Sequence, residues 1–273
     1  MAENEEIRDN PTTVNGLRAI EMRYRPIFDS FTKGAAFYQS SMRLNAPDMG
    51  VLLPERFMPV VESDDRCIPL FKLALLQTIK AAEKFTGREL DFDWISVNIP
   101  LRLLRRSDCT NILTEFTGMV GAKNNKICLE IPSSVFDDED SCCRSIRKLK
   151  DAGFHTMITG VDAASFPLMR IADFEPEYVM LSEEITASIG KDKRSDTCIC
   201  SLITLIRDLD AEPIATGVAS AETAEKFYEF ECSYYTGAGS ATGDFSGSFL
   251  QERFIRRKNQ EHEHEQEQSE TLA

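Results

Sequence analysis

The segment Ala36-Phe37-Tyr38-Gln39-Ser40-Ser41-Met42-Arg43 is predicted to be the second strand of a closed α/β barrel. A first strand is expected in Arg18–Asp29, because apolar and charged residues alternate there. Lys33-Gly34 between them predicts a tight turn, and therefore a hairpin. The second strand would end at the mouth of the barrel, where folds of this kind carry their chemistry.

Beyond the hairpin, short apolar segments alternate with helical ones. A long helix is expected over about 70–85, where apolar residues recur at helical spacing: Leu70, Leu73, Leu76, Ile79 and Ala82. Further strands are expected at 94–98, 127–131, 156–160, 178–182, 213–217 and 234–237. Further helices are expected around 107–121, 139–152, 165–173, 184–210 and 220–231.

This alternation gives about eight strands, the number in a TIM-like (β/α)8 barrel. An open, doubly wound sheet is the competing architecture. Two observations favour the barrel. No glycine-rich phosphate loop follows the first strand, and a hairpin-like turn joins the first two strands.

Composition narrows the range of functions. The 273 residues carry a net charge of −14, which disfavours nucleic acids and anionic membranes as partners and suits a basic protein surface. No apolar run reaches the ~18 residues of a membrane span, and the first residues do not form a signal peptide. A soluble, cytoplasmic protein is expected.

Three regions are distinguished along the chain. Residues 1–17 are polar and aperiodic and predict a disordered leader, residues 18–256 form the barrel domain, and residues 257–273 predict a disordered acidic tail. His262 and His264 alternate with carboxylates in that tail and could hold a metal weakly, although a solvated tail is favoured.

The eight cysteines are scattered, and no two form a C-x2-C pair. This spacing signals neither a zinc site nor a redox motif. We expect these residues to act mostly as small buried apolar side chains.

The ends of the predicted strands carry few charged groups: Gln39, Arg43, Asn98, Glu130, Thr159, Gly160, Ser182, Thr216 and Thr236. Glu130 is the one carboxylate among them, and His155 lies at the opposite end of its strand. Two-metal phosphodiester hydrolysis needs several carboxylates to hold its cations. We therefore expect neither a metal nor another cofactor at the barrel mouth.

Four short segments occur in a recognisable order: Tyr24-Arg-Pro-Ile-Phe-Asp29, Leu53-Pro-Glu-Arg-Phe-Met-Pro59, Ser96-Val-Asn-Ile99 and Leu129-Glu-Ile131. Together with Arg43, they resemble motifs of the EAL family of cyclic di-GMP phosphodiesterases, over about residues 18–250. The resemblance implies a barrel whose first strand is antiparallel.

The resemblance also implies which site residues remain. The family's metal-binding Asn and Glu correspond to Asn98 and Glu130. At seven positions where the family has a carboxylate or its catalytic lysine, this chain has another residue: Gln39, Ser133, Thr159, Gly160, Met180, Ser182 and Thr216. The chain thus resembles a degenerate, stand-alone family member, and hydrolysis is predicted to be lost.

A barrel without catalysis is expected to act as a regulatory protein–protein interaction module in bacterial signalling, with an unknown protein partner, such as a regulator. The acidic runs Glu183-Glu184 and Asp137–Asp140 would meet a basic partner, although a solvated rim explains them as well. A homodimer is a further expectation from the resemblance, but the family's dimerisation loop is altered here to Val161–Ser165.

Two alternatives stay open. In the first, Arg43, Asn98 and Glu130 are a remnant site, and the protein is a non-catalytic cyclic di-GMP receptor. The simpler interpretation, which is favoured, is that Arg43 and Glu130 neutralise each other in the barrel mouth. In the second alternative, the chain is a residual phosphodiesterase.

Overall fold

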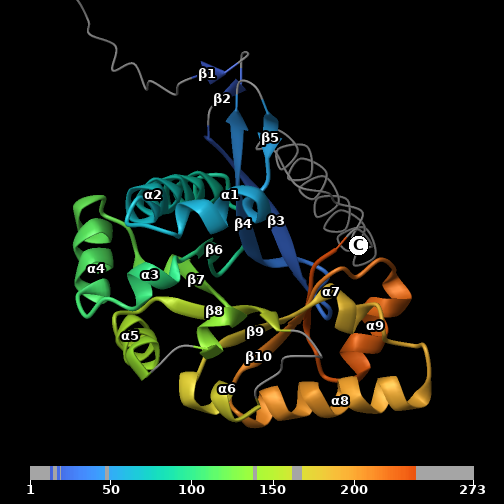
Figure 1. Ribbon diagram of the computed structural model, residues 1–273. Coiled ribbons are helices and arrows are strands. Elements are labelled where there is room, and N and C mark those ends of the chain that lie inside the picture. Colours follow the sequence, from blue (N-terminus) through green and yellow to red (C-terminus); the bar gives the residue numbers. More distant parts are fainter. Residues whose placement is uncertain are drawn as a thin grey trace, which may run out of the picture.

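A computed structural model describes residues 13–14, 17–18, 20–46, 49–137, 140–161 and 168–237 (Figure 1). Its main sheet has nine strands: β3 (Ile20–Asp29), β4 (Ala35–Ala46), β5 (Gly50–Leu52), β6 (Ile95–Asn98), β7 (Ile127–Pro132), β8 (His155–Val161), β9 (Tyr178–Leu181), β10 (Glu212–Ala215) and β11 (Tyr234–Tyr235). Their order in space is β3-β11-β10-β9-β8-β7-β6-β4-β5. A further pairing of β3 with β4 closes eight strands into a barrel and leaves β5 at its edge.

β3 is the antiparallel strand of this barrel. It runs antiparallel to both β4 and β11, whereas the other barrel strands pair in parallel. The turn between β3 and β4 is held by Asp29, whose carboxylate accepts hydrogen bonds from the backbone N–H groups of Phe31 and Thr32 at 2.7 and 2.8 Å. The predicted TIM-like barrel with an antiparallel first strand is confirmed.

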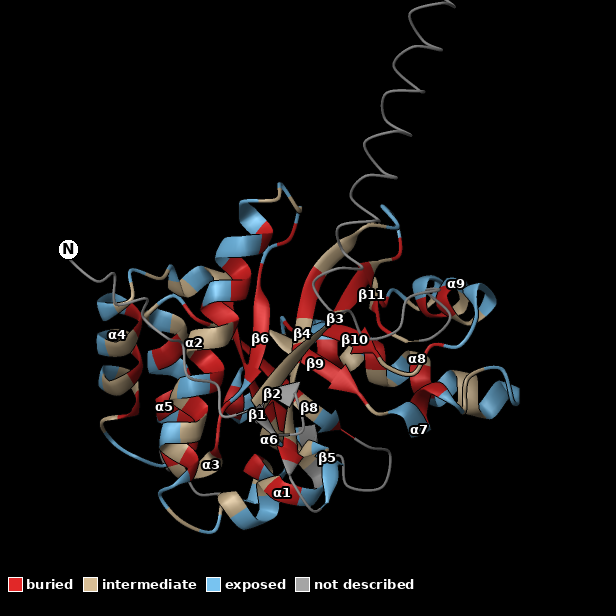
Figure 2. Ribbon diagram, turned by 90° about the horizontal axis from the view of Figure 1, so that it is seen from above, coloured by how far each residue is buried: buried red, intermediate tan, exposed pale blue. Residues whose placement is uncertain are grey.

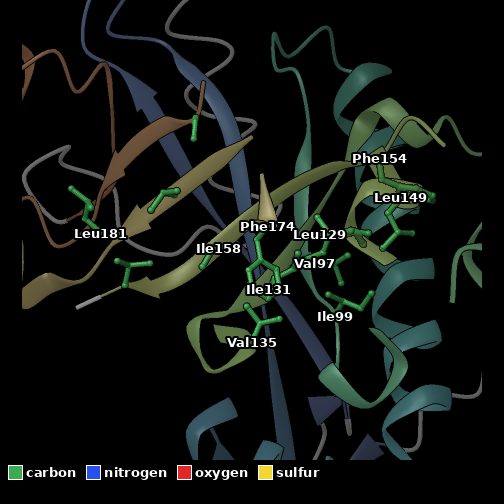
Figure 3. Close-up of a cluster of buried hydrophobic side chains, with 14 of the residues drawn as sticks. Val97, Ile99, Leu129, Ile131, Val135, Leu149, Phe154, Ile158, Phe174 and Leu181 are labelled. Atoms are coloured by element: carbon green, nitrogen blue, oxygen red, sulfur yellow. The ribbon is translucent and has the colours of Figure 1, made fainter. Parts of the chain in front are cut away.

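Helices surround the barrel (Figures 1 and 2). The α-helices are α1 (Pro54–Val61), α2 (Cys67–Thr86), α3 (Leu101–Leu104), α4 (Cys109–Met119), α5 (Asp140–Asp151), α6 (Leu168–Phe174), α7 (Glu183–Thr186), α8 (Lys193–Asp208) and α9 (Ala221–Glu229); two short 3-10 helices are η1 (Asn124–Lys126) and η2 (Ser133–Asp137). The largest hydrophobic cluster lies between them and the strands. Figure 3 shows part of it, with Val97, Leu129 and Ile131 of the strands near Leu149 and Phe154.

The structure departs from the predicted elements in two places. A single helix over 184–210 was wrong, because Gly190 adopts a left-handed φ of 77° and Asp192 then caps a new helix, α8. Helix α1 is absent from the helices expected above; it begins at Pro54, and in this first turn a missing N–H is tolerated.

At the ends of the chain, the structure covers only part of the expected regions. Thr13–Val14 (β1) pairs with Leu17–Arg18 (β2) within the segment expected to be a leader. The rest of residues 1–17, the acidic tail 257–273 and the domain end at 256 lie outside the described residues. None of the described helices has the length and apolar character needed to cross a bilayer.

The eight cysteines are all free, and six of them are buried, as expected for small apolar side chains. Cys198 is exposed and Cys200 is partly exposed.

One end of the barrel interior is closed by apolar side chains, which we call the barrel floor: Ile27, Phe37, Trp94, Cys128, Met157, Met180 and Ile214. Phe37 and Trp94 stack at its centre, with ring centroids 4.1 Å apart and planes 5° from parallel. The floor separates the two ends of the barrel. The polar side chains that face inward above the floor make up the barrel mouth.

Removing the Phe37 ring should therefore be costly. We expect Phe37→Ala to lower the free energy of unfolding by about 3–5 kcal/mol, because it leaves a cavity beneath the mouth. Phe31→Ala, in the same hairpin but 78% exposed, is the matched control and should change it by less than about 0.5 kcal/mol. Urea unfolding of both variants measures this, and equal effects would contradict the assignment of the floor.

Candidate functional site

The register of β3 and β4 fixes which side chains face the barrel interior. Directly opposed residues of an antiparallel pair project to the same side of the sheet, and successive residues alternate. Ile27 opposes Phe37, and both belong to the floor. The same inward face therefore carries, in order toward the mouth, Arg25 opposite Gln39, Arg23 opposite Ser41, and Glu21 opposite Arg43.

Glu130, on β7, is the centre of the polar layer above the floor. It is 2% exposed. One carboxylate oxygen accepts a hydrogen bond from the Ser96 hydroxyl. The other accepts a hydrogen bond from Gln39 Nε2 at 3.2 Å, and the same amide lies 3.5 Å from the sulfur of Met180. The carboxylate is thus held by β4 and β6 side chains and rests against the floor.

Burial raises the pKa of Glu130 from its ordinary value of 4.5 to about 7. The hydrogen bonds from Ser96 and Gln39 and the charge of Arg25 oppose this rise. Burial prevails because an ionised carboxylate loses its hydration here, and neutral hydrogen-bond donors replace it incompletely.

The expected pairing of Arg43 with Glu130 stays a prediction. A cation whose charge acts on Glu130 is Arg25, which lies opposite Gln39 in the hairpin. Arg43 is two inward positions further along β4, opposite Glu21. At that level Glu21 also forms an ion pair with Arg23, with 2.9 Å between the guanidinium and carboxylate atoms. The inner face of the hairpin therefore carries three arginines, Arg23, Arg25 and Arg43, and one carboxylate, Glu21.

The remaining residues singled out from the sequence ring the mouth without converging on Glu130. The hydroxyl groups of Ser133 and Thr216 donate to backbone carbonyls, those of Gly160 at 2.9 Å and Leu181 at 2.7 Å. Ser182 is the residue before helix α7. The hydroxyl groups of Ser133 and Thr216 thus tie neighbouring strand ends together.

Two backbone observations complete the ring. Asn98 is exposed at the end of β6 and neighbours Glu130 in the parallel pairing. Thr159 is half-buried. Gly160 has a left-handed φ of 74°, a backbone conformation that glycine adopts without strain.

Of the predicted site residues, the structure brings Gln39, Glu130 and Met180 together. The sequence analysis did not connect Ser96 or Arg25 to Glu130. Strand alternation could have found them, since Ser96 lies two residues before Asn98 and Arg25 two before Ile27. Among the residues that the structure describes, no three His, Cys, Asp or Glu side chains are grouped so that they could hold a metal ion.

This fold has counterparts among known proteins. The family model "EAL domain" matches residues 12–241. The chain belongs to the EAL domain family.

Relatives with curated descriptions are remote. The probable cyclic di-GMP phosphodiesterase PdeD of Escherichia coli K12 is 22% identical over 207 residues, which are 75% of this chain and 38% of PdeD. The blue light- and temperature-regulated antirepressor BluF of the same strain is 26% identical over 136 residues, 49% of this chain and 34% of BluF. The EAL domain studied here spans about a third of the length of the curated relatives that it matches.

Solved structures share the fold. The EAL enzyme Bd1971, in its form bound to cAMP and cyclic di-GMP, superposes with a TM-score of 0.75 at 21% identity, covering 86% of this chain and 64% of that one. The PaMucR phosphodiesterase in complex with cyclic di-GMP gives 0.74 at 15% identity, covering 85% and 94%. At this identity, the likeness shows the EAL barrel fold alone.

The raised pKa of Glu130 has a consequence for stability. The folded chain holds this proton up to about pH 7, whereas the unfolded chain releases it near 4.5, so the stabilisation is full below 4.5 and is lost as pH rises through 7. Glu130→Gln keeps a neutral group and should not show this loss. Between about pH 5 and pH 8, we expect the wild type to lose up to about 3 kcal/mol of unfolding free energy relative to this variant.

Urea unfolding at both pH values measures the difference. Glu115→Gln, at an exposed position on α4, is the control and should follow the wild type. Parallel curves for the wild type and Glu130→Gln would show that Glu130 is ionised throughout.

Proposed function

We propose that this EAL domain does not hydrolyse cyclic di-GMP and that it acts in bacterial signalling through contact with another protein. The observation that carries the first part is the setting of Glu130, a buried carboxylate bound by protein side chains. The second part rests on the outer surface.

The groups around Glu130 do not suit the divalent cations of metal-dependent phosphodiester hydrolysis. Mg²⁺ requires hard oxygen ligands and several negative charges. Ser96 and Gln39 donate hydrogen bonds to the Glu130 carboxylate, and the Gln39 amide also lies against the Met180 sulfur. The charge of Arg25 acts on the same carboxylate. A carboxyl group that keeps its proton to about pH 7 would also have to release it before binding a cation. The positive charge of Arg25 would also oppose the approach of a metal cation to Glu130.

The outer surface offers apolar side chains for a protein contact. Four large ones are exposed between residues 49 and 60, on and beside β5 and α1: Met49, Val51, Leu53 and Val60, with exposed fractions of 68, 50, 46 and 65%. Exposed apolar side chains that cluster in this way are typical of interaction surfaces. β5 is also the edge strand of the sheet, and edge strands accept strands from other chains.

The net charge of the chain and the description of one relative support the same proposal. The net charge of −14 suits a basic partner, and Glu183 and Glu184 extend this acidic character to the barrel rim. The relative BluF is an antirepressor, which is a regulatory role.

A non-catalytic cyclic di-GMP receptor is the second candidate. Solved structures with this fold carry the nucleotide, and Arg43 and Asn98 lie at the mouth, where it would enter. A residual phosphodiesterase activity is the third candidate and rests on relatives such as PdeD.

Turnover of cyclic di-GMP distinguishes the residual phosphodiesterase from the two non-catalytic candidates. Incubated with cyclic di-GMP and either Mg²⁺ or Mn²⁺, the purified chain is expected to form no linear pGpG, because the described part of the chain holds no carboxylate cluster to position the cations. Liquid chromatography of the products measures this. Metal-dependent turnover that disappears in Glu130→Ala would overturn the proposal and place a residual activity in this site.

A capture experiment tests the surface. The chain with Val51→Glu should lose a specific protein partner from a lysate of the native bacterium, because a charge on the exposed edge opposes apolar docking. Met119→Glu, at a position on α4 that is 77% exposed, is the matched control and should retain the partner. Equal recovery of every protein by both variants would remove this surface from the proposal.

A further inference from the structure

A small pocket lies outside the barrel, between the hairpin of β3 and β4 and helices α1 and α2. Its volume is about 40 Å³, enough for one or two atoms of the size of a water oxygen. The residues that line it are mostly apolar, and they include Leu70 and Phe71 of α2. Its hairpin residues Met22, Ser40 and Met42 alternate with the inward residues Arg25 and Gln39 and so lie on the outer face, and Asn98 of the barrel mouth also lines the pocket.

Sulfur is concentrated in this pocket. Of its thirteen lining residues, four carry sulfur, whereas the whole chain has only nine Met and eight Cys in 273 residues. The four come from three parts of the fold: Met22 and Met42 from the hairpin, Met58 from α1 and Cys67 from the start of α2.

Strand register and the start of helix α2 place three of these side chains. Met22 and Met42 are directly opposed in the β3–β4 ladder, so both project to the outer face at the same level. Cys67 is the first residue of the 20-residue helix α2 and is 1% exposed. A helix N-terminus favours a thiolate over a thiol, whereas burial of Cys67 raises its pKa.

This donor set selects one class of ligand. Thioethers and thiolates are soft donors, which prefer Cu(I) and its chemical analogue Ag(I) over Mg²⁺ or Ca²⁺. Zn²⁺ would require further thiolate, imidazole or carboxylate ligands. A monovalent cation with one thiolate forms a neutral unit, which an apolar pocket can bury without an unpaired charge.

We propose that this pocket binds one Cu(I) ion through the thioethers of Met22, Met42 and Met58 and the thiolate of Cys67. Binding forms a bond between copper and the Cys67 sulfur and releases the thiol proton to solvent, with no change in oxidation state. The carboxylates of Glu62 and Asp65 act on the Cys67 thiol and would draw a cation toward it, against the charge of Arg102.

The ordinary explanation of such a cluster is core packing, because methionine fills irregular space. That explanation and the proposal differ in what methionine replacement does. Leucine has a similar volume and preserves packing, but it has no donor atom. Replacement by leucine thus separates ligation from folding.

The test is Cu(I) competition between the full chain and the chelator bicinchoninate, without oxygen and with ascorbate to keep copper reduced. The wild type is expected to withdraw one Cu(I) per chain. The double variant Met22→Leu/Met42→Leu and the variant Cys67→Ser should each bind at least ~10-fold more weakly, as expected when a ligand is lost. Thermal unfolding without copper shows whether each variant is folded.

Matched controls exclude binding elsewhere. Met119→Leu and Met169→Leu, at positions 77% and 80% exposed, and Cys198→Ser, at an exposed cysteine, should all bind as the wild type does. X-ray absorption of the copper-loaded chain should show sulfur neighbours only. The proposal is overturned if the wild type withdraws no copper, if Met22→Leu/Met42→Leu binds as tightly as the wild type, or if oxygen or nitrogen neighbours dominate.

Discussion

The burial of one carboxylate, that of Glu130, is the constraint on which the barrel mouth depends. An ionised carboxylate in this position needs a counter-charge, and in a metal-dependent enzyme cations supply it. Here Ser96 and Gln39 donate hydrogen bonds, Arg25 contributes a charge, and the pKa of Glu130 still rises to about 7. Protein groups thus bind this carboxyl group, and the proton that it keeps to about pH 7 neutralises it further.

The hairpin of β3 and β4 connects this layer to the rest of the molecule. Its strict alternation sends Arg25 and Gln39 into the barrel and Met22 and Met42 outward to α1 and α2. A shift of one residue would exchange the two sets, placing methionines in the barrel mouth and arginines among apolar helix residues. One register thus determines both the charge balance of the mouth and the sulfur-lined pocket.

Periodicity predicted the fold well, because strands β6 to β11 are short, mostly apolar and separated from one another by helices. It failed over 184–210, where the break depends on the left-handed conformation of Gly190. The contacts of Glu130 were harder to predict, for a different reason. Which side chains meet across a barrel depends on strand register, and register is set by packing of the whole sheet rather than by any one segment. Strand alternation in the sequence could place Arg25 and Ser96 on the inward face, but only the register of the closed barrel brings both to Glu130.

The most direct test of this account is the titration of the Glu130 carboxyl group by carbon-13 NMR, with and without Mg²⁺. We expect a pKa near the value of about 7, unchanged by the cation, because protein groups already surround the carboxylate. A pKa that falls below about 5 when Mg²⁺ is added would mean that the cation binds Glu130 directly. That result would contradict the account and restore a metal centre to the barrel mouth.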